Sequence, residues 1–159
     1  MIDNVLVATY GMLLDPEVMQ EICPEAVEYD KEFGVEAAKI LDFKLEFRTH
    51  LTIVPSPFDY VPVGLWSVPR ECLYMLDRAE GEGIYYERRI IDVWFELNGK
   101  IASADAFVYV MLNRETRPQR VAGHGYVDNV ACGYDHFGLD KYKLIHAVKT
   151  AKDKDQSRG

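Results

Sequence analysis

Two long strand-forming runs that meet at Asn98-Gly99 constrain the fold of this chain more than any other feature. An Asn-Gly pair readily adopts the positive φ angles of a type I′ turn, whose twist matches that of the strands it joins. The runs at residues 85–97 and 101–112 therefore predict a β-hairpin. One face of the second run is built from small residues, Ala102, Ala104, Ala106, Val108 and Val110. Another element can therefore pack closely against this face.

Shorter signals predict the remaining elements. Residues 5–9 form an apolar run typical of a strand buried on both faces, and Asp15-Pro16 marks the start of a helix that extends to about Cys23. Further strands are expected at residues 38–47, 51–54 and 61–68, and further helices at residues 69–81, 125–137 and 140–152. We expect one domain at residues 1–151, followed by a charged, solvated tail at residues 152–159.

Two glycines indicate specific features of the predicted elements. Gly64 falls inside a predicted strand, where a missing side chain indicates close approach of another backbone. Gly138 separates the last two predicted helices and is expected to end the first of them.

Composition excludes several classes of function. The chain has 159 residues, 48% of them hydrophobic, and a net charge of −8. This length supports one good hydrophobic core. Phosphate binding needs clustered Lys and Arg, which are scarce here, so we expect no nucleic-acid partner and favour a small-molecule or protein partner.

The cysteines and the N-terminus suggest a compartment. Cys23, Cys72 and Cys132 are odd in number and far apart in the sequence, with no CxxC pair, which predicts neither a disulfide framework nor a thiolate zinc site. The N-terminus lacks a basic segment followed by a long apolar one, and no apolar run approaches membrane-spanning length. We therefore expect an unprocessed cytoplasmic protein without a membrane span.

Several short patterns fall short of a metal or cofactor site. The glycine pairs at residues 81–83 and 123–125 lack the third glycine and the strand-to-helix setting of a dinucleotide-binding loop. Cys132 and His136 are four residues apart on a predicted helix but have no matching second pair. A buried thiol and a surface imidazole are favoured there over a metal site.

Other single residues are expected to be structural. Ser56 and His50 lack the spacing of a nucleophile elbow or a catalytic triad and are expected in loops. Trp66 and Trp94 fall in predicted strands, where an aromatic side chain usually belongs to the core.

Glu80 is the residue whose position most suggests chemistry. It lies at the carboxyl end of a predicted helix, where the helix dipole disfavours a negative charge by about 0.3–1 kcal/mol. Partial burial beside Tyr85 or Tyr86 would raise its pKa further, in the direction that a general base near neutral pH requires. The local sequence alone favours the alternative, a surface ion pair between Glu80 and Arg78, Arg88 or Arg89.

Several motifs, taken together, resemble the γ-glutamylcyclotransferase superfamily, including its AIG2-like and γ-glutamylamine cyclotransferase branches. In chain order they are Tyr10-Gly11-Met12-Leu13 after the first strand, the strand at residues 38–47, Ile53-Val54-Pro55-Ser56-Pro57, Val63-Gly64-Leu65-Trp66, and Leu76-Asp77-Arg78-Ala79-Glu80-Gly81 followed by Tyr86-Glu87-Arg88. Each motif is weak alone, whereas their order and spacing over residues 5–142 are fairly specific.

The resemblance implies an α+β fold, a small mixed β-barrel flanked by helices, with no metal and no organic cofactor. It implies an enzyme that cyclises a γ-glutamyl group to 5-oxoproline and releases the attached amine or amino acid. The substrate's own α-amine is the nucleophile, so ring closure is intramolecular and the protein mainly moves protons and holds the substrate bent.

The resemblance also assigns roles to particular residues. Glu80 becomes the leading candidate for the catalytic general acid and base. The backbone N–H groups of Gly11, Met12 and Leu13 would hold the substrate's α-carboxylate or the oxyanion. Tyr10 and Tyr86 would form walls of the pocket.

Departures from the family pattern keep other functions open. Met12 stands where the family usually has Ser or Thr. Leu13 replaces the Asn of the glutathione-related branches but matches the γ-glutamylamine branch, and residues 48–52 lack the Gly-Gly of the dipeptide-specific enzymes. A binding module that has lost turnover is the main alternative. A third possibility is an amidohydrolase or acyl-transfer enzyme that uses water or a second amine in place of internal attack.

Overall fold

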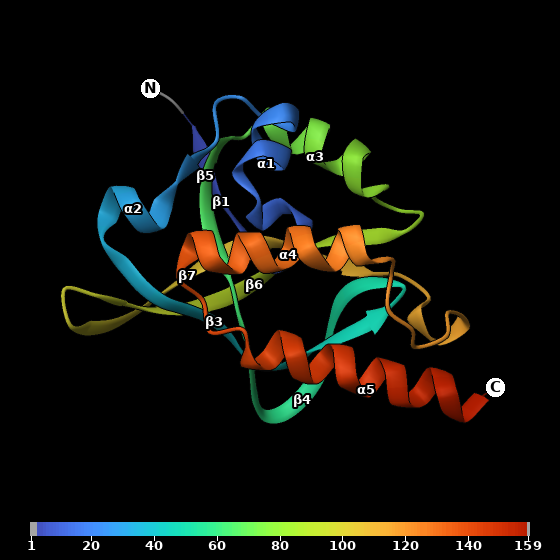
Figure 1. Cartoon of the computed structure of the whole chain (residues 1–159). Helices are drawn as coiled ribbons and strands as arrows, with labels where there is room; N and C mark the ends of the chain where they lie inside the picture. The colour runs from blue at the N-terminus through green and yellow to red at the C-terminus, as the bar shows by residue number, and fades with distance from the viewer. Residues whose placement is uncertain (1–2, 159) are drawn as a thin grey trace.

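The computed structural model describes residues 3–158, which form a seven-stranded sheet flanked by helices (Figure 1). The strands are β1 (Asn4–Thr9), β2 (Val27–Glu28), β3 (Val35–Arg48), β4 (His50–Pro62), β5 (Gly64–Pro69), β6 (Tyr86–Leu97) and β7 (Lys100–Met111). The helices are η1 (Met12–Leu14), α1 (Pro16–Ile22), α2 (Tyr29–Phe33), α3 (Cys72–Glu80), η2 (Arg114–Thr116), α4 (His124–Phe137) and α5 (Tyr142–Arg158).

The sheet is mixed and curled. Its strand order is β2-β5-β1-β7-β6-β3-β4, and β1 pairs parallel to β7 while the other neighbours are antiparallel. Thr52 on the edge strand β4 nevertheless accepts a hydrogen bond from the Met111 N–H at the end of β7, at 2.9 Å. The expected α+β architecture is therefore confirmed, although the sheet curls toward a barrel without closing into one.

The hairpin predicted around Asn98-Gly99 is present as β6 and β7. Asn98 and Gly99 have φ angles of 53° and 76°, as a type I′ turn requires. On the small-residue face of β7, Ala106, Val108 and Val110 are buried in the main core. The same core contains side chains of α4 and α5, and in Figure 1 these two helices lie in front of the sheet.

Separate strands were expected at residues 51–54 and 61–68, and this prediction was wrong. β4 continues through Pro55-Ser56-Pro57 and ends only at Pro62, so Ser56 and His50 lie in a strand. A bulge explains how: Asp42 has a φ of 62° and its carboxylate accepts the Phe58 N–H at 3.0 Å. This side-chain partner satisfies a backbone donor in the irregular segment.

The C-terminal helices are placed as expected but differ in length. Gly138 ends α4 in the left-handed conformation, with a φ of 68°. The charged tail expected from residue 152 onward is helical: α5 continues to Arg158, and residues 152–158 are exposed. Within residues 3–158, none of the helices has both the length and the hydropathy to cross a bilayer.

Two single-residue expectations were wrong. Trp66 is fully buried, but Trp94 on β6 is 39% exposed. Cys132 on α4 is exposed rather than buried. His136 is partly exposed and its Nε2 lies 2.7 Å from a carboxylate oxygen of Glu28. Strand and helix periodicity fixed which residues share a face, but only the packing decided which face is covered.

Candidate active site

A cavity of about 740 Å³ opens where the ends of β1, α3 and β4 meet α4 and the segment after η2. Its lining includes every residue that the sequence suggested for the site, namely Glu80, Tyr10, Gly11, Met12, Leu13 and Tyr86. These residues come from three separate segments of the chain. The fold therefore brings the predicted site residues together around one space.

The turn after β1 lines the cavity and carries backbone N–H groups that its short helix does not use. η1 follows Gly11, and its first hydrogen bond runs from the Leu14 N–H to the Gly11 carbonyl at 3.0 Å. The N–H groups of Met12 and Leu13 precede this bond and so have no partner within the helix. Two adjacent donors that η1 itself does not use are suited to an anion, whichever side chains the turn carries.

Close packing holds this turn in place. The Trp66 indole N–H donates to the Leu13 carbonyl at 3.0 Å from the β5 side. On the other side, a Cβ atom on Gly133 of α4 would lie 2.4 Å from the Leu14 Cβ. Gly64 is equally constrained, since a Cβ there would meet Leu14 at 2.7 Å and Phe137 at 2.8 Å. The close approach expected at Gly64 is confirmed, with side chains rather than a backbone as the neighbours.

Glu80 is the last residue of α3 and lines the cavity. Gly81 ends the helix with a φ of 67°, and the Gly81 and Glu82 N–H groups bond back to carbonyls of the last turn. The chain then folds over so closely that a Cβ on Gly81 would lie 2.6 Å from Tyr85. Burial raises the pKa of Glu80 to about 7.

Of the three arginines considered as partners of Glu80, Arg88 pairs with Asp77 instead. Arg88 donates to one carboxylate oxygen of Asp77 at 2.7 Å, and the Tyr109 hydroxyl donates to the other at 2.6 Å. Within residues 3–158, Glu80 forms neither a hydrogen bond through its carboxylate nor a salt bridge. The surface ion pair considered for Glu80 is therefore not formed.

Three tyrosines, Tyr10, Tyr86 and Tyr126, line the same cavity as Glu80. The Tyr86 hydroxyl donates to the Leu51 carbonyl at 2.8 Å, and the Leu51 N–H donates to the Tyr126 hydroxyl at 3.1 Å. The Tyr10 hydroxyl donates to the Tyr109 carbonyl. Burial raises the pKa of Tyr10 and Tyr86 well above the ordinary value, and that of Tyr126 to about 12, with the nearby Glu80 adding to each rise. These hydroxyls remain neutral donors at physiological pH.

Tyr126, His50 and Arg117 are among the cavity residues that the sequence analysis did not assign to the site. Tyr126 lies on α4, and its hydroxyl is 3.4 Å from the point where a Cβ on Gly11 would lie. His50 packs against Tyr126 with ring centroids 4.9 Å apart, and burial, followed by the Arg117 charge, lowers its pKa. Arg117 stacks over the Tyr85 ring at 5.5 Å. None of these three residues lies in a motif that the sequence analysis recognised. No local signal therefore pointed to them.

Arg117 is notable for its charge. Among residues 3–158 it has no carboxylate partner within salt-bridge distance, and it borders the same cavity as Glu80. Its backbone carbonyl accepts a hydrogen bond from Arg48 at 2.7 Å, which fixes this part of the loop. The cavity thus offers a proton acceptor, backbone donors and one unpaired cation.

The sequence matches the family model described as γ-glutamyl cyclotransferase, AIG2-like, over residues 7–128. The chain belongs to this family. The match spans the β1 turn, α3 with Glu80, and Tyr126. No curated protein matches the sequence significantly.

Solved structures show the same γ-glutamyl cyclotransferase fold. A γ-glutamyl cyclotransferase superposes with a TM-score of 0.66 and 22% identity, covering 94% of this chain and 87% of the other. YkqA from Bacillus subtilis gives a TM-score of 0.71 and 16% identity over 94% of this chain and 55% of its own. A yeast γ-glutamyl cyclotransferase specific to glutathione superposes with a TM-score of 0.62 and 14% identity, covering 95% of this chain and 96% of the other. At these identities the likeness concerns the fold.

Proposed function

We propose that this protein is an active γ-glutamyl cyclotransferase that releases 5-oxoproline and an amine or amino acid, with Glu80 as general base and acid. The observation that carries the proposal is the half-buried Glu80 carboxylate, which has no ion-pair partner among residues 3–158 and whose pKa of about 7 suits proton transfer near neutral pH. It borders the same cavity as the free backbone donors of η1.

The reaction follows from these groups. Glu80 takes a proton from the substrate's α-amino group, and the amine nitrogen attacks the carbonyl carbon of the γ-glutamyl amide to form the five-membered ring. The Met12 and Leu13 N–H groups stabilise the resulting oxyanion or the α-carboxylate. Glu80 then gives the proton to the departing nitrogen as its bond to carbon breaks. Tyr10 and Tyr86 form walls of the pocket. Each hydroxyl donates a hydrogen bond to a backbone carbonyl, which holds the side chain in place.

The decisive experiment is release of 5-oxoproline, measured by mass spectrometry over a panel of γ-glutamyl amino acids, γ-glutamyl amines and glutathione. We expect turnover by the parent protein and a loss of about 100-fold or more in Glu80→Gln, the usual contribution of a general acid-base group. Glu82→Gln is the matched control, because Glu82 is an exposed carboxylate two residues away.

Other outcomes would favour the other functions. A ligand that binds equally well to the parent and to Glu80→Gln, without 5-oxoproline from any substrate, would identify a binding module. Free glutamate as the product would identify hydrolysis by water. Unchanged turnover in Glu80→Gln would refute the assignment of Glu80.

We also propose that the leaving group carries a carboxylate, because Arg117 is a cation without a carboxylate partner in the described part of the cavity. A charged hydrogen bond to a carboxylate contributes about 1.5–3 kcal/mol. Arg117→Gln should therefore lower kcat/KM about 10- to 100-fold for γ-glutamylalanine and leave γ-glutamylethylamine, which differs only by that carboxylate, nearly unchanged. An equal loss for both substrates would place Arg117 on the shared glutamyl group and overturn this assignment.

A further inference from the structure

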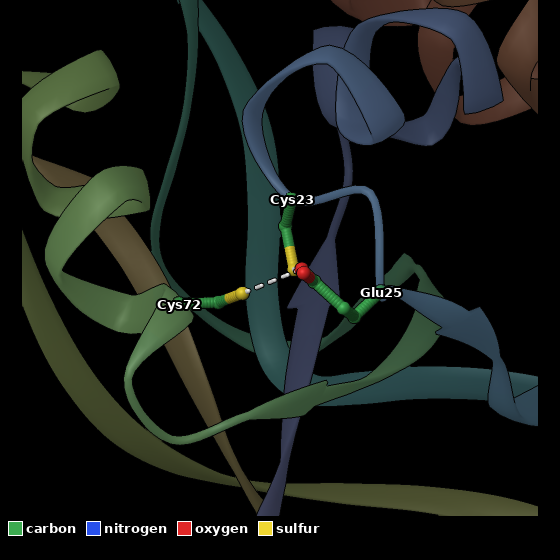
Figure 2. A group of neighbouring side chains, drawn as sticks. All are labelled: Cys23, Glu25 and Cys72. Carbon is green, nitrogen blue, oxygen red and sulfur yellow. Dashed lines mark hydrogen bonds between the residues drawn. The ribbon is translucent and has the colours of Figure 1, made fainter.

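Three potential metal ligands meet where the end of α1 faces the start of α3. Cys23 follows the last residue of α1, Cys72 is the first residue of α3, and Glu25 lies in the loop that leads to β2. In Figure 2 the two sulfur atoms and the Glu25 carboxylate point toward one another. Their ligand atoms all lie within 4.8 Å of one another.

The spacing of these atoms fits a tetrahedral ion. A Glu25 carboxylate oxygen lies 3.5 Å from the Cys72 Sγ and 3.8 Å from the Cys23 Sγ. In a tetrahedral zinc site, with Zn–S bonds of about 2.3 Å and Zn–O bonds of about 2.0–2.2 Å, neighbouring sulfur and oxygen ligands are about 3.5–3.7 Å apart. An ion could therefore bind all three atoms with only small side-chain shifts.

The surroundings leave the cluster without a compensating charge. Cys23 is fully buried and Cys72 is 8% exposed, and both sulfurs belong to the apolar core between α1, α3 and β5. Glu25 is exposed, which gives the cluster a path to solvent. Within residues 3–158, no basic side chain forms a salt bridge with Glu25. Two thiols and a carboxylate in such a place match the soft and anionic ligands that thiophilic cations prefer.

The alternative, a redox-active pair of thiols, is less consistent with this environment. Thiol-disulfide exchange proceeds through a thiolate, which basic neighbours favour and an adjacent carboxylate disfavours. The carboxylate beside the two thiols works against exchange, whereas it adds a ligand for a cation.

We propose that Cys23, Glu25 and Cys72 bind one thiophilic divalent cation, best matched by Zn²⁺, with water completing the tetrahedron. Such an ion would fasten the end of α1 to the start of α3. Glu80 lies eight positions after Cys72, or about 12 Å farther along the helix axis. The ion would therefore support α3 from the end opposite to the cavity. The site is independent of the reaction proposed above.

The first test is titration of the reduced protein with Co²⁺, followed by the thiolate-to-cobalt charge-transfer absorption. We expect one equivalent to bind to the parent protein and to Cys132→Ser, the control that removes the one cysteine outside the cluster. Cys23→Ser and Cys72→Ser should each lose most of the absorption. Glu25→Gln should bind at least about 10-fold more weakly, a loss that even an outer-sphere partner can cause.

A second measurement separates ligand loss from misfolding. Zn²⁺ should raise the Tm of the parent protein and of Cys132→Ser, because a ligand that binds the folded state stabilises it. Glu25→Gln alters an exposed side chain and should fold normally, yet should gain much less from Zn²⁺. The proposal is overturned if Co²⁺ gives no thiolate absorption, if Cys23→Ser and Cys72→Ser absorb like the parent, or if the signal depends on Cys132.

Discussion

Two carboxylates on one helix show how residue environment divides chemical roles. The Asp77 carboxylate accepts hydrogen bonds from Arg88 and from the Tyr109 hydroxyl and so joins α3 to β6 and β7. Glu80, one turn later, receives neither partner and has its pKa raised to about 7 by burial. The same functional group therefore makes a structural contact at one position and has a raised pKa at the other.

The raised pKa of Glu80 has a consequence for stability. Its ordinary value is 4.5, so burial favours the protonated form, and the corresponding stability is fully present below pH 4.5 and lost as the pH rises through about 7. The side chain of Glu80→Gln cannot ionise. The unfolding free energy of this variant relative to that of the parent should therefore rise by about 2–3 kcal/mol from pH 5 to pH 8. Urea denaturation at both pH values measures this. A constant difference between the two proteins would contradict the raised pKa.

The same group should shape the pH dependence of the proposed reaction. As a base Glu80 must be ionised, so kcat/KM should rise with pH and level off above about pH 7. Profiles for two γ-glutamyl substrates whose α-amines differ in pKa distinguish enzyme from substrate. The limb near pH 7 should be common to both. A limb that moves with the substrate would belong to the α-amine instead.

At the scale of elements, the site depends on how closely α4 approaches η1. Gly133 leaves room for Leu14, since a Cβ there would lie 2.4 Å from the Leu14 Cβ and 2.9 Å from its backbone carbonyl carbon. η1 is held between this helix and Trp66 of β5, whose indole N–H donates to the Leu13 carbonyl. Helix packing thus sets the position of the backbone donors.

Gly133→Ala tests this coupling. Helix propensity alone would favour Ala by about 1 kcal/mol, but overpacking against Leu14 should cost about 1–3 kcal/mol and displace η1, which lowers both stability and turnover. Gly125→Ala in the same helix is the control, because a Cβ there meets nothing within 4 Å. Thermal unfolding and kcat/KM of the two variants measure the effect. If both variants behave alike, the contact does not position η1.

At the scale of the whole molecule, the curl of the sheet brings β4 against the end of β7. Thr52 is fully buried, and its hydroxyl accepts the Met111 N–H at 2.9 Å across this approach. Beside it, Leu51 uses both of its backbone groups to bind the hydroxyls of Tyr86 and Tyr126. The curvature of the sheet and the shape of the cavity are therefore linked.

Thr52→Val should show this link. The substitution leaves the buried Met111 N–H without its acceptor, which costs about 1–3 kcal/mol. Thr52→Ser retains the hydroxyl and should lose less. Urea denaturation measures the stability, and hydrogen exchange of the Met111 amide should be faster in Thr52→Val than in Thr52→Ser. Equal exchange in both variants would show that the hydroxyl does not hold the two strands.

Much of the local structure was predictable because its causes are local. Asn98-Gly99 specified its turn, Asp15 accepts the Glu17 N–H at 3.0 Å as the N-cap of α1, and Gly138 ended α4. The motifs also predicted that Glu80 and the β1 turn share a site, and the two do border one cavity. The bulge at Asp42 was not predictable from a pattern that assumes regular strands.

The sequence by itself determined the hairpin, the caps, the turn after β1 and the placement of a carboxylate at the end of α3, because each depends on a few neighbouring residues. Only the tertiary structure decided that Arg88 pairs with Asp77 rather than with Glu80, that Tyr126 and Arg117 complete the cavity, and that Cys23 and Cys72 meet beside Glu25. The physical reason is that desolvation and charge pairing depend on which distant segments pack together. Backbone propensity and side-chain spacing along the sequence do not specify that packing.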